Sequence, residues 1–179
     1  MNNAVYELFG AIEEGTPEEY RPMFEVNVFG LIETTRAALP VLRRSAGTIV
    51  NMSSGAGVAG GGGAGYYNAA KFAVGGISEA LAGELEPFGI RVLIVKPGPF
   101  RTDFLGRSIT MAVNEMPEYT ADSRKHYRGT HNGNQAGDPD KAIAVILRAI
   151  DADEAPLHLP LGDRARDRRA KAVCLPRQY

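Results

Sequence analysis

The sequence predicts an α/β fold built on a parallel sheet. Segments with helical periodicity alternate with short apolar segments, which is the pattern of parallel strands joined by crossover helices. The segment Ile90–Val95 is almost entirely Val, Ile and Leu, as expected for a parallel strand covered on both faces. The 179 residues, 44% of them hydrophobic and 23% charged, suffice for one globular domain of ordinary size.

A long amphipathic helix is expected over residues 16–44. Thr16 and Glu19 have the spacing of a capping box, and Pro17 suits the first helical position. We expect the helix to be perturbed near Gly30 and Pro40. Its apolar stripe follows the i, i+3, i+4 spacing and comprises Met23, Val26, Asn27, Gly30, Leu31, Thr34, Ala38 and Leu42.

The remaining elements follow in order along the chain. Short apolar segments predict strands over residues 48–52, 90–95 and 157–161. Further helices are expected over residues 66–86 and 140–151. The segment 99–137 between the second strand and the last helix is expected to be irregular.

The composition excludes several classes of protein. A formal net charge of −1 leaves no chain-wide basic surface for nucleic acid, and the single Cys174 cannot form an internal disulfide. The first ten residues lack the features of a secretory signal, and no apolar segment is long enough to span a bilayer. We therefore expect a cytoplasmic protein with one domain over residues 1–162 and a basic tail over residues 163–179.

Glycines are concentrated between Gly55 and Gly65. The first six residues match G-x-G-x-x-G, but the four consecutive glycines Gly60–Gly63 cannot propagate the helix that a dinucleotide fingerprint requires. No acidic residue stands at the end of a second strand about twenty positions on. We interpret this segment as the mobile rim of an active site rather than as a phosphate loop.

Four polar side chains are expected near this segment. Tyr67 and Lys71 are four residues apart and share a helix face, and Ser54 ends the preceding strand. Asn27 lies upstream on the first helix. A nearby ammonium stabilises a phenolate, and a hydroxyl stabilises charge on a substrate oxygen, so the group suits proton transfer at an alcohol oxygen. Taken singly, these residues are equally typical of a surface helix pair, a turn residue and a buried amide.

The motifs that contain these residues resemble those of the short-chain dehydrogenase/reductase family. They stand in the family's order within residues 1–162: NNAV at 2–5, NVFG at 27–30, NMSSGAG at 51–57, YNAAK at 67–71 and KPGPFRT at 96–102. The resemblance implies the carboxy-terminal part of a doubly wound parallel-sheet (Rossmann-like) fold, with the N-terminal strands missing. Without those strands, the strand over residues 48–52 would be an exposed apolar edge.

The resemblance also implies the roles of individual residues. The catalytic tetrad would be Asn27, Ser54, Tyr67 and Lys71. Tyr67 would be the general acid/base, Lys71 would lower its pKa, Ser54 would orient the carbonyl and Asn27 would hold a water of the proton relay. The cofactor, NAD or NADP, would be held by Asn3, Tyr67, Lys71, Pro97, Gly98 and Thr102. No metal is implied.

Three departures from the family's pattern affect the cofactor site. Val5 replaces a glycine beside the expected cofactor position, and Ala70 replaces a serine. The family's amino-terminal T-G-x-x-x-G-x-G loop, with the residue that selects NAD or NADP, is absent from the sequence. The sequence therefore predicts an oxidoreductase that interconverts an alcohol and a ketone or aldehyde. The alternatives are a non-catalytic truncated fragment, which persists as a self-associating pseudoenzyme, and an interaction module that uses the basic tail.

The segment 99–137 is the expected substrate cover. A hydrophobic small-molecule substrate is one interpretation of its apolar residues, and packing of the loop onto the body is the other; they are Phe100, Phe104, Leu105, Met111, Met116, Tyr119 and Tyr127. His126 and His131 lack evident partner ligands, so no metal role is expected. Self-association is expected through helices exposed around Leu31–Leu42 and Leu81–Leu85.

Overall fold

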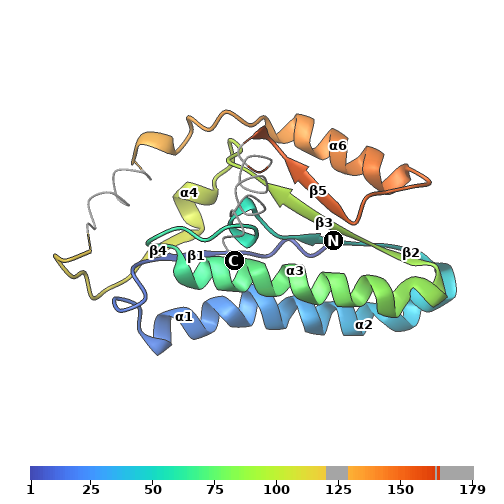
Figure 1. Cartoon of the computed structure of the whole chain (residues 1–179), viewed down its shortest axis with the longest axis horizontal. Helices are drawn as coiled ribbons and strands as arrows, with labels where there is room; N and C mark the ends of the chain where they lie inside the picture. Colours follow the sequence, from blue (N-terminus) through green and yellow to red (C-terminus); the bar gives the residue numbers. More distant parts are fainter. Residues whose placement is uncertain (120–128, 164, 166–179) are drawn as a thin grey trace, which may run out of the picture.

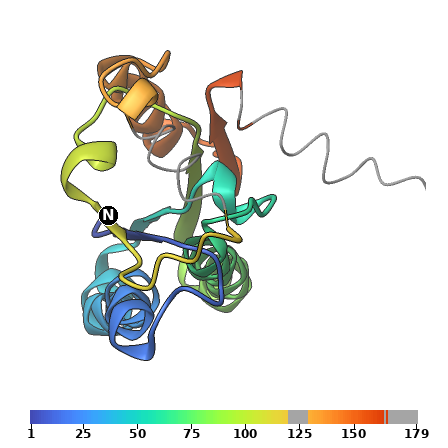
Figure 2. The same ribbon diagram turned by 90° about the vertical axis from the view of Figure 1, so that its left-hand side faces the viewer.

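A central parallel sheet lies between two layers of helices (Figures 1 and 2). The computed structural model describes residues 1–119, 129–163 and 165. Within them, the sheet has the strand order β2-β3-β5, with β2 at Gly47–Met52, β3 at Ile90–Pro97 and β5 at His158–Leu161. Helix α6 (Pro139–Asp151) covers one face, and α2 (Gly30–Ser45) and α3 (Gly65–Leu85) cover the other. The predicted α/β architecture is confirmed.

The two faces of the sheet bury separate apolar clusters. Val50 and Leu93 pack with Ile146 of α6. Their neighbours Ile49 and Val92 belong to the cluster on the side of α3. Successive residues of a strand point to opposite faces, so a strand with helices on both sides needs apolar residues at every position. This is why the continuous apolar run in β3 predicted the sheet correctly.

The predicted long helix consists of α1 (Pro17–Phe24), a π-helical turn (Glu25–Phe29) and α2 in direct succession. At its start the Thr16 N–H donates to Glu19 Oε2 at 2.9 Å, as the capping box predicts. The perturbation before Gly30 is confirmed, whereas Pro40 lies inside α2.

The π-helical turn corrects the predicted apolar stripe. Val26 and Thr34 are exposed, and Leu31 and Thr35 are buried in α2. A π-helical turn holds one residue more than an α-helical turn, so the buried face shifts along the sequence after it. A strict 3.6-residue spacing does not anticipate this shift.

A second, smaller sheet was not predicted. Strand β1 (Glu7–Phe9) pairs in parallel with β4 (Ile109–Met111), which follows the short helix α4 (Phe104–Arg107). The expectation that residues 99–137 are irregular is wrong for α4 and β4, which both lie in that range. A strand of three residues is too short to show a periodic pattern in the sequence. In addition, β1 pairs with a strand that lies far from it along the chain. Two single 3-10 turns lie at Gly55–Gly57 and Glu86–Phe88.

The edge of β2 is covered where the N-terminal segment crosses it. The Asn2 N–H donates to the Val50 carbonyl at 2.8 Å, and the Met52 N–H donates to the Asn2 carbonyl at 3.1 Å. The expectation of an exposed edge strand is therefore wrong at this position. The Asn2 backbone uses ladder groups that an exposed edge would leave open.

A buried amide network fixes this crossing. Asn2 Nδ2 donates to Asn51 Oδ1 at 2.8 Å, and Asn51 Nδ2 donates to Ser78 Oγ at 2.9 Å. Ser78 in turn donates to the Val74 carbonyl of α3 at 2.6 Å. Asn51 and Ser78 are completely buried. The network therefore joins the N-terminal segment, β2 and α3 through groups that water cannot replace.

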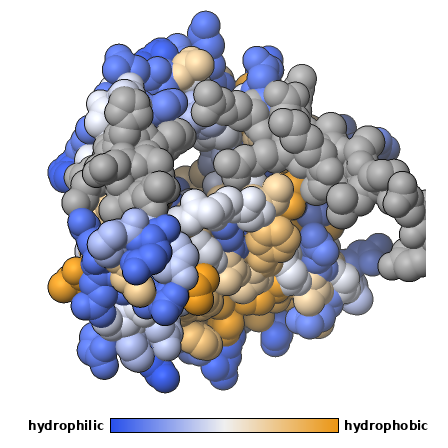
Figure 3. Space-filling view, turned by 60° about the vertical axis from the view of Figure 1, so that its left-hand side comes forward, coloured by the Kyte–Doolittle hydropathy of each residue, from blue (hydrophilic) through white to orange (hydrophobic). Residues whose placement is uncertain are grey.

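Self-association through the helices around Leu31–Leu42 and Leu81–Leu85 stays a prediction, but their leucines are not the exposed residues. Leu31 and Leu85 are buried, and Leu42 packs in the cluster under the sheet. Hydrophobic side chains gather over the lower half of the face in Figure 3. The large apolar residues of these helices that are exposed are Val26, Phe29, Val41 and Phe72. Of the helices described, none is long and apolar enough to cross a membrane. All but two residues of the predicted basic tail lie outside the described residues.

We predict that Asn51→Ala lowers the free energy of unfolding by about 1–3 kcal/mol, because it leaves the Asn2 amide and Ser78 without their buried partner. Urea unfolding followed by circular dichroism measures the change. The exposed Asn114 provides the control, since Asn114→Ala should change stability by less than about 0.5 kcal/mol. Equal stability of the two variants would show that the amide network contributes nothing.

Candidate active site

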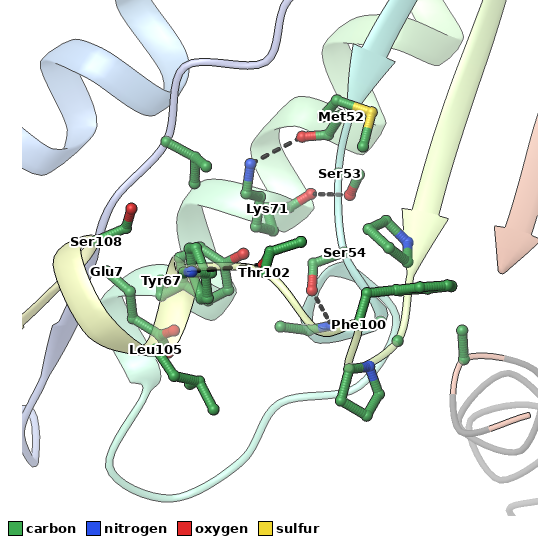
Figure 4. Close-up of a pocket in the computed structure, with 18 of the residues that line it drawn as sticks. Glu7, Met52, Ser53, Ser54, Tyr67, Lys71, Phe100, Thr102, Leu105 and Ser108 are labelled. Atoms are coloured by element: carbon green, nitrogen blue, oxygen red, sulfur yellow. Dashed lines mark hydrogen bonds between the residues drawn. The ribbon is translucent and has the colours of Figure 1, made fainter. Parts of the chain in front are cut away.

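A cavity of about 1040 Å³ opens at the carboxyl ends of β2 and β3. This edge of a parallel sheet is where ligands bind in doubly wound folds. Ser54 follows β2, Pro97 is the last residue of β3, and Gly98 comes directly after it. Tyr67 and Lys71 extend into the cavity from the first turns of α3 (Figure 4). The structure thus brings together three of the four predicted catalytic residues in one cavity wall.

Two reciprocal hydrogen bonds lock the end of β2 onto α3. Lys71 Nζ donates to the Met52 carbonyl at 2.8 Å, and Ser53 Oγ donates to the Lys71 carbonyl at 3.0 Å (Figure 4). Ser54 is the next residue along the chain, and Tyr67 lies one helical turn before Lys71. The lock therefore determines where the serine hydroxyl and the phenol meet.

The electrostatics of the pair differ from the expectation. Burial raises the pKa of Tyr67 well above its usual value of 10.0, the charge of Glu7 raises it further, and a hydrogen bond with Ser54 acts in the opposite direction. The expected lowering of this pKa by Lys71 is not found. The ammonium of Lys71 is directed to the Met52 carbonyl and lies 5.7 Å from the centre of the Tyr67 ring.

Lys71 is itself affected by its burial. With 2% of its surface exposed, its pKa falls from 10.5 to about 8, although the charge of Glu7 acts to raise it. Around neutral pH the ammonium is therefore largely charged, and it loses its proton at a lower pH than an exposed lysine does.

Asn27 lies behind this wall and does not line the cavity. It sits in the π-helical turn, where its Nδ2 donates to the Tyr6 carbonyl at 2.8 Å and its Oδ1 accepts from the Tyr6 N–H at 3.2 Å. Both ends of the amide thus hold the backbone of the segment that leads into β1. The water-holding role expected for Asn27 stays a prediction.

The residues expected to hold the cofactor lie around the same cavity. Asn3, Pro97, Gly98 and Thr102 all line it together with Tyr67 and Lys71. Val5 also lines the wall, and of the described residues other than glycine only Ala46 has a positive φ, so Val5 introduces no backbone strain. Hydroxyl and ammonium donors beside a wide cavity suit the ribose hydroxyls of a nicotinamide nucleotide.

The comparison with known proteins decides the family. A family model described as short chain dehydrogenase matches residues 1–112. The chain belongs to this family. The sequence motifs and the parallel sheet both agree with that assignment, and the predicted family resemblance is confirmed.

Individual relatives of this family member support the assignment. The chain is 35% identical over 165 residues to a 3-ketodihydrosphingosine reductase of Bacteroides thetaiotaomicron. The matched region covers 90% of this chain and 61% of that protein. Among solved structures, a short-chain dehydrogenase from Streptomyces avermitilis shares 41% identity at a TM-score of 0.85, covering 96% of this chain and 63% of that one. A short-chain dehydrogenase from Sphingobium yanoikuyae in complex with NADPH shares 25% identity at a TM-score of 0.69, covering 99% and 65%. The chain thus spans less than two thirds of the length of each.

The glycine-rich segment forms part of the cavity wall in this family member. Gly61, Gly62 and Gly63 line the cavity, whereas Gly57 is buried under α3. The mobility expected for the segment stays a prediction. Tyr66, the neighbour of Tyr67, donates to the Ile12 carbonyl at 2.6 Å and therefore has a structural role.

The expected substrate cover contributes only part of its apolar residues to the cavity. Phe100, Phe104 and Leu105 line it, whereas Met111 does not line it and packs against the cluster of Phe9, Leu105 and Ile109. Acidic side chains hold the rest of the segment: Glu19 accepts from the Val113 N–H at 2.9 Å, Glu14 accepts from the Met116 N–H at 3.0 Å and Glu13 accepts from the Tyr119 hydroxyl at 2.5 Å. His126 and Tyr127 lie outside the described residues. In the described part of the chain, no group of three or more potential ligands could hold a metal ion.

Several polar residues of the cavity were not anticipated from the sequence. Glu7 and Gln135 are two of them, with 5% and 4% of their surfaces exposed. A signal for Glu7 existed, because an acidic residue stands alone in the apolar run Val5–Phe9. No local signal marks Gln135, since its position depends on backbone contacts with a distant segment.

We predict that Gly57→Ala disturbs the lock between β2 and α3. An added Cβ would lie 2.6 Å from both the Lys71 carbonyl oxygen and Ser53 Oγ, which is closer than van der Waals contact. The free energy of unfolding should fall by about 1–3 kcal/mol in urea denaturation. Gly62→Ala is the matched control in the same segment, because its Cβ would meet nothing within 4 Å. If both variants unfold like the wild type, the close packing under Gly57 is not a constraint.

Proposed function

We propose that the chain acts as an oxidoreductase that interconverts an alcohol and a ketone or aldehyde, with NAD or NADP as cofactor. The observation that carries this proposal is the position of the Tyr67 phenol, beside Ser54 and Lys71 in the cavity at the carboxyl ends of the strands. The relative named as a ketone reductase and the relative that binds NADPH support the same chemistry. The preference between the two cofactors is not part of the proposal.

Tyr67 is the proposed proton donor to the carbonyl oxygen during reduction. At neutral pH the phenol carries its proton, which is the form a general acid needs, and burial raises its pKa further above the usual value of 10.0. Burial also excludes water that would otherwise compete for the proton.

Ser54 and Lys71 complete the proposed catalytic group. Ser54 Oγ accepts from the Ala56 N–H at 3.1 Å, which orients the hydroxyl so that it can donate to the substrate oxygen. The Lys71 ammonium has three donors, of which the contact with Met52 uses one. Asn27 acts indirectly, since it positions the backbone of Tyr6, the residue before β1. Two residues of β1, Glu7 and Phe9, line the cavity.

The proposed cofactor residues are Asn3, Tyr67, Lys71, Pro97, Gly98 and Thr102. Tyr67 and Lys71 would hold the ribose next to the nicotinamide, and Asn3 would also lie near the cofactor's ribose. The nicotinamide end would contact Pro97, Gly98 and Thr102. When bound, a reduced nicotinamide supplies the hydride for the carbonyl carbon.

The proposal is tested by titrating the purified chain with NADH and NADPH and assaying a panel of ketones. We expect saturable binding of at least one dinucleotide and reduction of at least one ketone. Tyr67→Phe should lower kcat/KM at least about 100-fold, because it removes the proton donor and keeps the ring. Tyr20→Phe is the control, since Tyr20 stacks on Tyr66 outside the cavity lining and its loss of a hydroxyl should leave kcat/KM unchanged.

Absence of saturable binding of both dinucleotides contradicts the proposal. A Tyr67→Phe variant that folds and retains full activity contradicts the assigned role of Tyr67. The first result would favour the non-catalytic alternative, whereas the second would assign the proton transfer to another group.

A further inference from the structure

Glu7 and Gln135 are nearly buried polar side chains that line the cavity outside the proposed catalytic group. Glu7 lies on β1, and Gln135 lies on the segment that leads into α6. Glu7 has 5% and Gln135 4% of its surface exposed. A buried polar group is unfavourable unless it is hydrogen-bonded, so two of them in one cavity call for a physical reason.

The strand geometry directs Glu7 at the cavity. Val5, Glu7 and Phe9 alternate along the segment and all line the cavity, whereas Leu8 packs into the core with Tyr67. In Figure 4 Glu7 lies beside Tyr67 and Leu105. Its charge also raises the pKa of both Tyr67 and Lys71, which agrees with a position close to the reacting end of the cavity.

Gln135 is held rigidly by its backbone. Arg101 Nη1 donates to the Gln135 carbonyl at 3.0 Å, and the Gly137 N–H donates to the Pro99 carbonyl at 3.1 Å. The backbone of Gln135, from which the side chain extends, is therefore fixed in the cavity wall. Its Oε1 is buried and has no hydrogen-bond partner within the described residues. A ligand that donates to this oxygen would satisfy it.

Glu7 and Gln135 line a largely apolar cavity that includes Phe9, Phe100 and Leu105. The buried Gln135 Oε1 meets a ligand only after its side chain rotates towards the cavity. The other charged side chains that line it are differently engaged: Lys71 donates to Met52, and Asp103 pairs with Arg107 at the exposed rim. A carboxylate offers several lone pairs, so a ligand contact with Glu7 is compatible with its contacts inside the protein.

We propose that Glu7 and Gln135 are specificity-determining residues, which select a carbonyl substrate that carries a hydroxyl or ammonium group in addition to the reacting carbonyl. The proposal rests on the function proposed above and narrows its substrate class. It replaces the expectation of a purely hydrophobic substrate. Anionic substrates are disfavoured, since they would meet the Glu7 carboxylate in a cavity of low dielectric constant.

The test measures ligand binding without cofactor or turnover. Hexylammonium and hexanoate, which share a six-carbon chain and differ in charge, are titrated into the chain and followed by NMR. The wild type should bind hexylammonium at least about tenfold more tightly than hexanoate. Glu7→Gln keeps the shape and removes the charge, so it should reduce this ratio at least about fivefold. Asp103→Asn, at the rim of the same cavity, should leave the ratio unchanged.

Gln135→Leu adds a readout that a structural role would not give. Removal of a buried acceptor without a partner should raise the melting temperature by a few degrees, whereas loss of a structural hydrogen bond would lower it. The same variant should weaken hexylammonium binding about threefold or more.

Equal affinities for the two probes in the wild type, or an unchanged ratio in a folded Glu7→Gln variant, would overturn the assignment of Glu7. A lower melting temperature or unchanged binding in Gln135→Leu would overturn that of Gln135. Because no step of this test requires NADH or NADPH, failure of the proposed reaction would be recognised separately.

Discussion

The site depends on one buried charge at the junction of β2 and α3. Lys71 donates its ammonium to the Met52 carbonyl, and its own carbonyl accepts from Ser53. These two bonds join the last residues of a strand to the first turns of a helix across the glycine-rich segment. The amide network around Asn51, the residue before Met52, supports the same junction. Ser54 and Tyr67 meet because this junction is fixed.

The burial that makes this junction rigid also sets its chemistry. A buried ammonium is costly, and Lys71 responds with a lowered pKa; a buried phenol resists ionisation, and Tyr67 responds with a raised one. Near neutral pH the pair consists of a protonated phenol and a largely charged lysine, although burial lowers the pKa of Lys71. Glu7 raises both pKa values, so a single carboxylate from β1 favours that state at both residues. The same carboxylate lines the cavity, so our proposals for proton transfer and for selectivity involve one wall.

Much of the central sheet could be predicted from the sequence, because each strand with helices on both faces must be apolar at every position. The reactive residues could be predicted because Tyr67 and Lys71 share a helix face and Ser54 ends a strand. Other features depend on contacts between distant segments. The pairing of β1 with β4, the crossing of Asn2 over β2 and the position of Gln135 leave no periodic signal. The direction of the Tyr67 pKa shift was also mispredicted, since spacing alone does not show that Lys71 is directed at a backbone carbonyl.

The pKa of Lys71 is the measurement that tests this account most directly. Lysine side chains labelled with ¹³C are titrated by NMR, and the Lys71 signal is assigned by its loss in Lys71→Met. The account predicts a pKa of about 8, well below those of exposed lysines, because the ammonium is buried at the junction. As the pH rises from about 8 towards 10, the unfolded chain binds more protons than the folded one, so Lys71 should contribute increasing stability relative to Lys71→Met. A Lys71 pKa near 10.5, with no such dependence, would show that the side chain is solvated and would contradict the buried junction.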